Sequence, residues 1–117
     1  REQGVGTIGI RVLAGGALSG RLERHPTAIP SVAPIASGPD YASDVARARA
    51  LEPLVAQGHA GSLVEASLRF AITGEALSTV LIGCSDLAQL EQAAAAVDRG
   101  PLSPAALASL GAIWRSA

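Results

Sequence analysis

Two short apolar segments constrain the fold of this chain more than any other feature. Residues 8–14 (IGIRVLA) and 78–83 (STVLIG) have the length and the glycine flanks of buried strands. Helical patterns follow, and strands that alternate with helices indicate βαβ units and a parallel sheet. Two strands are too few for a stable parallel sheet with covered faces. The sequence therefore predicts an α/β fold whose remaining strands come from elsewhere, so the chain is expected to be a fragment of a larger domain.

The rest of the chain shows apolar residues at helical spacing. A helix is predicted from Asp40 to Gly58, where the glycine stops it, and Pro53 is expected to kink or end it. Capping residues or an initial proline predict three further helices, over residues 62–73, 86–97 and 104–115. The predicted buried stripe of the helix over 86–97 consists of Leu87, Leu90, Ala94 and Val97. A Pro-rich loop, residues 21–40, separates the first strand from these helices.

Composition excludes several classes of function. Apolar residues make up 49%, charged residues only 16%, and the net charge is −1, so no basic patch is available for nucleic acid. Cys84 is the single cysteine, which rules out an intramolecular disulfide, while His25 and His59 are too few and too scattered for a metal site. No apolar run approaches the roughly 18 residues of a membrane span, and the first residues do not resemble a signal peptide. We therefore expect a soluble cytoplasmic protein with neither nucleic acid nor a membrane as a partner.

Three glycines near the start of the chain match the spacing of a dinucleotide-binding fingerprint but not its structural context. Gly4, Gly6 and Gly9 have the spacing GxGxxG. The fingerprint needs a strand before it and a helix after it, whereas nothing precedes these glycines and a strand follows them. We therefore interpret them as turn glycines.

A glycine-containing loop follows each predicted strand. Gly15 and Gly16 either let backbone amides approach a phosphate or form an ordinary strand-exit turn. The loop over residues 83–86 (GCSD) precedes a helix, whose free N–H groups attract anions. Ser85 or Asp86 can instead simply cap that helix, and capping is favoured. Cys84 lacks a basic partner in the sequence, so a small buried residue is favoured over a nucleophile.

Two longer segments resemble the aldo-keto reductases. Residues 8–20 (IGIRVLAGGALSG) resemble the seventh barrel strand of that family and the loop after it. Residues 62–93 (SLVEASLRFAITGEALSTVLIGCSDLAQLEQA) resemble its next helix, its eighth strand and its final cofactor-binding helix. The resemblance implies that residues 1–117 are the C-terminal, cofactor-binding portion of a (β/α)8 TIM barrel, with two parallel strands, several helices and a variable loop over 21–40. A whole barrel needs about 250 residues, so roughly half of it is missing.

The resemblance also implies positions for a cofactor, NADP or NAD. Leu13, Gly15 and Gly16 would lie beside the pyrophosphate, and Gly83, Cys84 and Ser85 beside the adenosine ribose and its 2′-phosphate. Three positions depart from the family pattern: Gln89 replaces a common arginine, Ala93 a common asparagine near adenine, and Ile10 a common aromatic residue on nicotinamide. Without the arginine, a 2′-phosphate loses a charge-assisted contact, so a preference for NADPH over NADH does not follow.

The family's catalytic Asp, Tyr, Lys and His lie on earlier strands, so the resemblance implies no catalytic residue here. The parent protein would reduce carbonyls or oxidise alcohols or sugars by hydride transfer, and this chain alone would be inactive. Alternatives are a non-enzymatic nucleotide-binding or assembly module and an inactive proteolytic fragment. Expected partners are the nicotinamide cofactor, a small carbonyl or alcohol substrate and the missing N-terminal half of the barrel. The isolated chain is expected to be a homo-oligomer, because unpaired strand edges recruit other chains.

Overall fold

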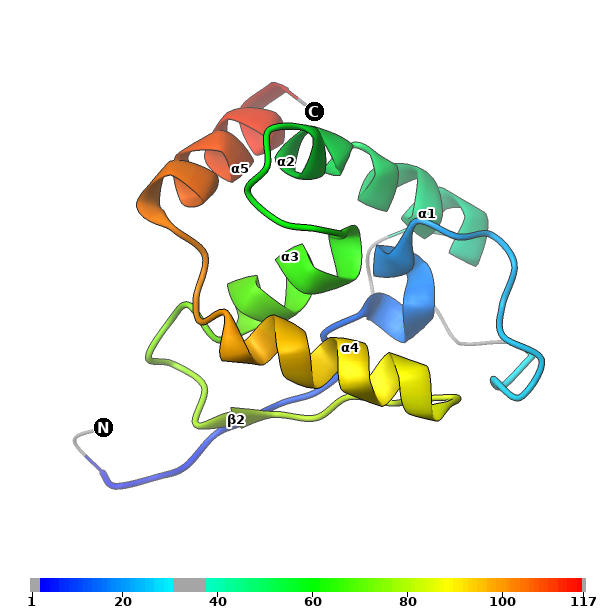
Figure 1. The fold of residues 1–117 in the computed structure, drawn as a ribbon, viewed down its shortest axis with the longest axis horizontal. Coiled ribbons are helices and arrows are strands. Elements are labelled where there is room, and N and C mark those ends of the chain that lie inside the picture. Colours follow the sequence, from blue (N-terminus) through cyan, green and yellow to red (C-terminus); the bar gives the residue numbers. More distant parts are fainter. Residues whose placement is uncertain (1–2, 31–37, 117) are drawn as a thin grey trace.

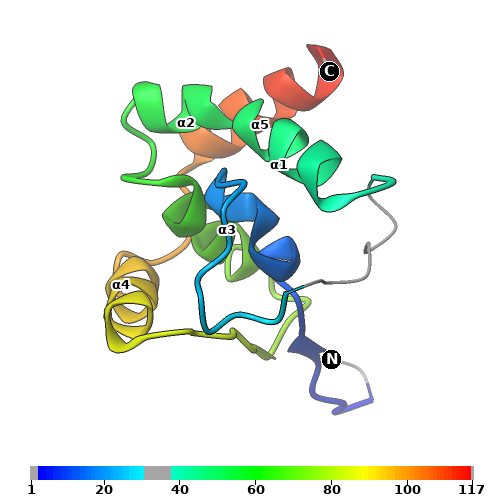
Figure 2. The same ribbon diagram turned by 90° about the vertical axis from the view of Figure 1, so that its right-hand side faces the viewer.

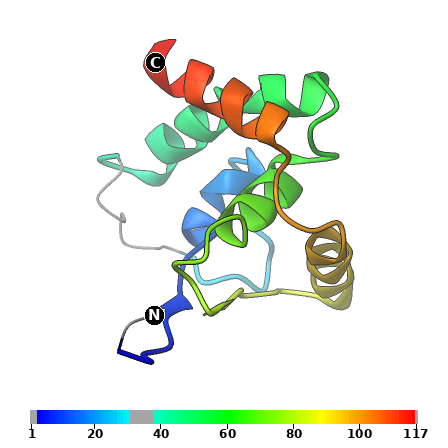
Figure 3. The same ribbon diagram turned by 90° about the vertical axis from the view of Figure 1, so that its left-hand side faces the viewer.

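The computed structural model describes residues 3–30 and 38–116, so part of the predicted Pro-rich loop lies outside the described residues. The elements in chain order are β1 (Ile8–Gly9), the 3₁₀ helix η1 (Ala14–Ser19), α1 (Tyr41–Arg49), α2 (Glu52–Ala56), α3 (Leu63–Ala71), β2 (Thr79–Val80), α4 (Leu87–Asp98) and α5 (Pro104–Ser116). Helix α3 lies in the middle of the molecule (Figure 1). Helices α1, α2 and α5 lie on one side of it, and α4 and the strands lie on the other (Figures 2 and 3).

The two strands pair in parallel, as the sequence predicts, with Ile8 opposite Thr79 and Gly9 opposite Val80. They are much shorter than predicted, because the predicted strands over 8–14 and 78–83 keep only two residues each. Backbone conformation ends β1, since Arg11 and Ala14 adopt left-handed φ angles of 57° and 51°. Within the described residues no third strand flanks β2. The fold is therefore a small α/β unit with two parallel strands rather than a complete barrel.

Polar caps define where the helices begin. The side chains of Asp40, Ser62 and Asp86 each accept a hydrogen bond from the backbone N–H three residues later. Hydrogen bonds from Ser43 lower the pKa of Asp40 below its ordinary value, because they favour the carboxylate. The helix predicted over 40–58 divides into α1 and α2, and Pro53 lies in the first turn of α2. The expected interruption by Pro53 is confirmed.

Two small clusters form the core, one on each side of α3. Ala66 packs with Leu54, Ala60 and Leu110, which joins α3 to α2 and α5. The second cluster contains Leu68 of α3 with Ala93 and Ala96 of α4. Partly buried side chains from both strand exits and from α3 pack against it: Val12, Leu13, Ile82 and Val64. Among the described elements, α3 alone contributes buried side chains to both clusters.

The predicted buried stripe of α4 was wrong. Leu87, Leu90 and Val97 are 68%, 50% and 41% exposed, and Ala94 is exposed as well. The residues that α4 buries are Ala93 and Ala96. Their small side chains let α4 pack closely against α3, and the larger side chains then point away from that contact. Periodicity alone does not distinguish these two faces, because both are apolar.

An apolar surface lies on the open side of the short sheet. Ile8, Ile10 and Leu81 are exposed there, next to the two strands. Parallel sheets are normally covered on both faces, so this surface is unusual for a finished domain.

In the described part of the chain no helix is long and apolar enough to cross a membrane.

A mostly buried ion pair lies within α3, and its arginine is hydrogen-bonded to the segments that precede α3 and follow α4. Arg69 is 13% exposed, and its Nη1 lies 3.0 Å from Oε1 of Glu65. The Arg69 guanidinium also donates to the backbone carbonyls of Gly100, His59 and Pro101, at 2.9, 3.2 and 3.1 Å. The other carboxylate oxygen of Glu65 accepts the Gly61 N–H at 3.1 Å. One side chain thus holds the connections that lead into α3 and into α5.

Candidate functional site

The first glycine loop is a tight 3₁₀ turn at the exit of β1. Gly15 and Gly16 have φ angles of 65° and 103°, which side chains rarely tolerate. The carbonyl of Leu13 accepts hydrogen bonds from Gly16 at 2.9 Å and from Leu18 at 3.2 Å. A Cβ at Gly16 would lie 3.5 Å from the Tyr41 hydroxyl, so there is room for it but the backbone would be strained. The turn therefore requires glycine for its conformation.

Arg24 fixes this turn from the following loop. Its Nη1 donates to the Gly15 carbonyl at 2.7 Å, and its Nε donates to the Ile29 carbonyl at 2.9 Å. The guanidinium carbon lies 5.1 Å from the centre of the Tyr41 ring, a cation–π distance. The Tyr41 hydroxyl in turn donates to the Arg21 carbonyl at 3.0 Å. A positive charge is therefore held close to the glycine turn.

The second glycine loop leads from β2 into α4. Gly83 and Cys84 are exposed, and their backbone N–H groups have no hydrogen-bond partner among residues 3–30 and 38–116. Ser85 differs, because its N–H donates to Oε1 of Gln89 at 2.8 Å. Asp86 caps α4 by accepting the Gln89 N–H at 2.8 Å. The interpretation of Cys84 as a buried residue was wrong, since the loop leaves β2 without any element covering it.

Residues 24–29 bridge the two glycine loops. Nε2 of His25 lies 3.1 Å from Oδ2 of Asp86, and the Thr27 hydroxyl donates to the Ser85 carbonyl at 3.1 Å. Nδ1 of His25 accepts the Thr27 N–H at 3.2 Å, so Nε2 carries the proton that faces Asp86. Together with Arg24 at Gly15, these contacts place both loops along one segment.

The predicted site residues lie in or directly before two loops that one segment connects, with two exceptions, Ile10 and Ala93. Leu13 and Ile82, which precede the two loops, pack against the same core cluster. Gly15, Gly16, Gly83, Cys84, Ser85 and Gln89 then lie in the two loops that residues 24–29 connect. Ile10 is exposed and no hydrogen bond ties it to either loop. Ala93 is buried against Leu68 rather than open to a ligand.

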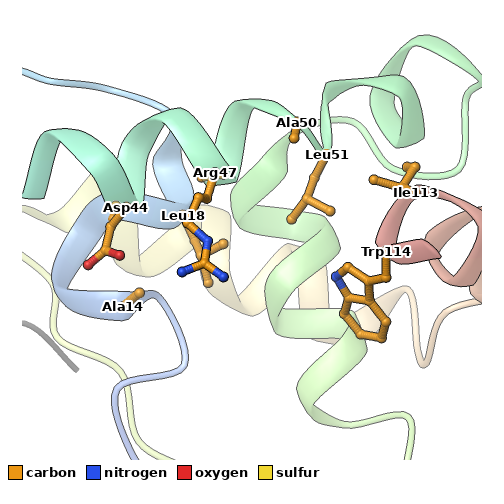
Figure 4. A pocket seen from close by; sticks show the side chains of 10 residues that line it. Ala14, Leu18, Asp44, Arg47, Ala50, Leu51, Ile113 and Trp114 are labelled. Carbon is orange, nitrogen blue, oxygen red and sulfur yellow. The ribbon is translucent and has the colours of Figure 1, made fainter. Parts of the chain in front are cut away.

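The sequence did not indicate a pocket that the structure shows on the described surface. A mainly apolar pocket of about 350 Å³ lies between η1, α1 and α5, as Figure 4 shows. Its lining includes Leu18, Leu51 and Trp114, with Asp44 and Arg47 from α1. Ala14, Ala17 and Leu18 of η1 line it, so it adjoins the first glycine loop, whereas its lining includes no residue of the loop over 83–86. No group of three metal-ligating side chains occurs in the part of the chain that the structure describes.

The two strands pair in parallel, and the loops that follow them are held by one segment, residues 24–29, which gives a small α/β unit. Comparison with known families agrees with this class, because the aldo/keto reductase family model matches residues 1–115. The chain belongs to the aldo/keto reductase family. This membership supports an oxidoreductase-type function in general. A search of curated proteins returned no match.

Proposed function

We propose that the chain is the C-terminal, cofactor-binding portion of a (β/α)8 oxidoreductase that uses NADP or NAD. The parent protein would reduce carbonyls or oxidise alcohols or sugars. The observation that carries this proposal is the bridge of residues 24–29, which joins the loop at Gly15 to the loop at Ser85. In barrels of this type, ligands bind at the C-terminal ends of the strands.

The residues of the two loops fit a dinucleotide. Gly15 and Gly16 present backbone without side chains, which allows a pyrophosphate to approach closely. Arg24 holds a positive charge beside them. Gly83 and Cys84 offer exposed N–H groups that lack partners in the described segments. The bound nicotinamide would supply the hydride, and the residues of this chain would bind and orient the cofactor.

Replacing Gly16 by alanine is expected to weaken NADH binding by about tenfold, equivalent to about 1.4 kcal/mol. The φ angle of 103° is strained for alanine, so the turn would shift away from its binding geometry. Gly58→Ala is the matched control, because Gly58 has a φ of 77° with open space around it and lies outside both loops. Both variants should lose about 1 kcal/mol of folding stability. Calorimetric titration of the intact protein with NADH measures the difference in affinity, and equal effects of the two variants would exclude Gly16 from the site.

We also propose that the isolated chain self-associates through its open sheet surface. Ile8, Ile10 and Leu81 are exposed beside strand edges that have no partner in the described chain. Light scattering behind a sizing column should give a mass above 11.7 kDa that rises with concentration. Ile8→Lys should lower that mass, whereas Leu22→Lys, at an exposed leucine away from the sheet, should not. A constant monomer mass for the unmodified chain would contradict the proposal.

A further inference from the structure

We propose that the pocket between η1, α1 and α5 binds a small aromatic carboxylate, with the ring against Leu51 and Trp114 and the carboxylate on Arg47. These three side chains lie on α1, on α5 and between α1 and α2, outside both glycine loops. The proposal does not depend on a bound cofactor, and it gives the chain a second ligand site.

The pocket has the size and the lining of a small-molecule site. Its volume is about 350 Å³, and ligand pockets commonly measure about 300–1,000 Å³. Alanines and larger apolar side chains make up most of the lining, and only Asp44 and Arg47 carry a charge. A volume at the lower end of the usual range suits a compact ring system and is too small for a dinucleotide.

Trp114 forms an aromatic wall of the pocket, and its orientation is fixed from behind. Its ring meets the Phe70 ring edge to face, with centroids 5.7 Å apart and planes at 87°. Trp114 is nevertheless 57% exposed. A ring that enters the pocket would cover apolar surface that now faces water. Aromatic pairs gain free energy beyond the area that they bury, so an aromatic ligand fits this wall better than an aliphatic one.

Two hydrogen-bond donors point into the pocket from different helices. Figure 4 shows the Arg47 guanidinium and the nitrogen edge of the Trp114 indole directed toward the space between them. In the part of the chain that the structure describes, the indole N–H forms no hydrogen bond. The guanidinium carries several N–H donors, so it can bind a ligand in addition to the contact that it already makes. Because both groups only donate, they require an acceptor on the ligand.

The charges of the pocket favour a carboxylate as that acceptor and place it near Arg47. Asp44 is buried and lies beside Ala14, on the side of the pocket away from Trp114 (Figure 4). An anion at that side would meet a like charge. At Arg47 the same anion gains a charge-assisted hydrogen bond, which is stronger than one to a neutral acceptor. The lining therefore fits a ring that carries a carboxylate on a short arm.

Calorimetric titration of the chain with 1-naphthylacetate tests the proposal, and 2-(1-naphthyl)ethanol is the uncharged control with the same ring. We expect the carboxylate to bind about tenfold more tightly, because the alcohol loses a charge-assisted hydrogen bond. Trp114 is the single tryptophan, so its indole N–H signal in a nitrogen-15 NMR spectrum should shift as the carboxylate binds. Equal binding of the two compounds, or an unchanged indole signal at saturation, would overturn the proposal.

Variants assign the binding to the named pocket. Arg47→Gln should lower the affinity for naphthylacetate to that of the alcohol, whereas Arg115→Gln removes the same charge next to Trp114, outside the lining, and should have no effect. Similar losses for both would refute the proposal. Ala50→Phe fills the pocket from an exposed lining position and should abolish binding, whereas Ala46→Phe, exposed outside the lining, should not. An indole signal that shifts with protein concentration without ligand would instead assign the pocket to a second copy of the chain, and the proposal would be wrong.

Discussion

Replacing Arg69 by alanine is expected to lower the free energy of unfolding by about 3 kcal/mol, because breaking a buried ion pair leaves its partner uncompensated. The Glu65 side chain is 10% exposed, and its carboxylate would keep only the 3.5 Å ion pair with Arg99 and the hydrogen bond from the Gly61 N–H. The carbonyls of Gly100, His59 and Pro101 would each lose a donor as well. Urea denaturation followed by circular dichroism measures this change.

Arg99→Ala provides the control for the Arg69 variant. Arg99 contacts the same carboxylate oxygen of Glu65, but its side chain is 64% exposed and the distance is 3.5 Å. Exposed ion pairs contribute about 0–1 kcal/mol, so its loss should be small. Equal losses for the two variants would mean that only the charge on Glu65 is important and that the backbone contacts of Arg69 are not.

The 117-residue chain alone is expected to show no carbonyl reduction with NADPH or NADH. Its sequence contains nine arginines and no lysine, and its single tyrosine, Tyr41, donates to the Arg21 carbonyl beneath Arg24. Within the described residues neither a lysine nor an unengaged tyrosine hydroxyl is thereby available as a general acid at the two glycine loops, and positioned acid catalysis supplies about 10²–10⁴-fold in rate. Absorbance of the reduced nicotinamide with a panel of aldehydes measures the activity. The intact parent protein is the positive control, and steady turnover by this chain alone would refute the expectation.

Local sequence signals predicted the helices well. Ser62 and Asp86 cap their helices because a short polar side chain satisfies a free N–H within the same few residues. The break before Pro53 and the parallel pairing of the strands also follow from the sequence. Strand length does not, because it depends on neighbouring strands and on the left-handed turns at Arg11 and Ala14. Long-range packing sets these features, so local patterns do not contain them.

In the candidate site, too, local features were predicted from the sequence and long-range contacts were not. Glycines at the predicted strand exits, a pair in the first loop and one in the second, indicated the position of both loops. The bridge between the loops was missed, since His25 and Thr27 lie in a Pro-rich segment whose contacts with Ser85 and Asp86 have no characteristic spacing. The contacts of Gln89 were predicted only in part. The family resemblance implied that Gln89 stands where an arginine is common, but the hydrogen bond from the Ser85 N–H is found only in the structure.

The position of α3 between the two core clusters determines how the chain loses its structure. Ala66 belongs to one cluster and Leu68 to the other, so opposite faces of a nine-residue helix support both. A helix of that length is not stable in water without packing. Opening either cluster therefore removes the support of α3 and, with it, the other cluster. Although neither core is large, we expect the chain to melt in one cooperative step.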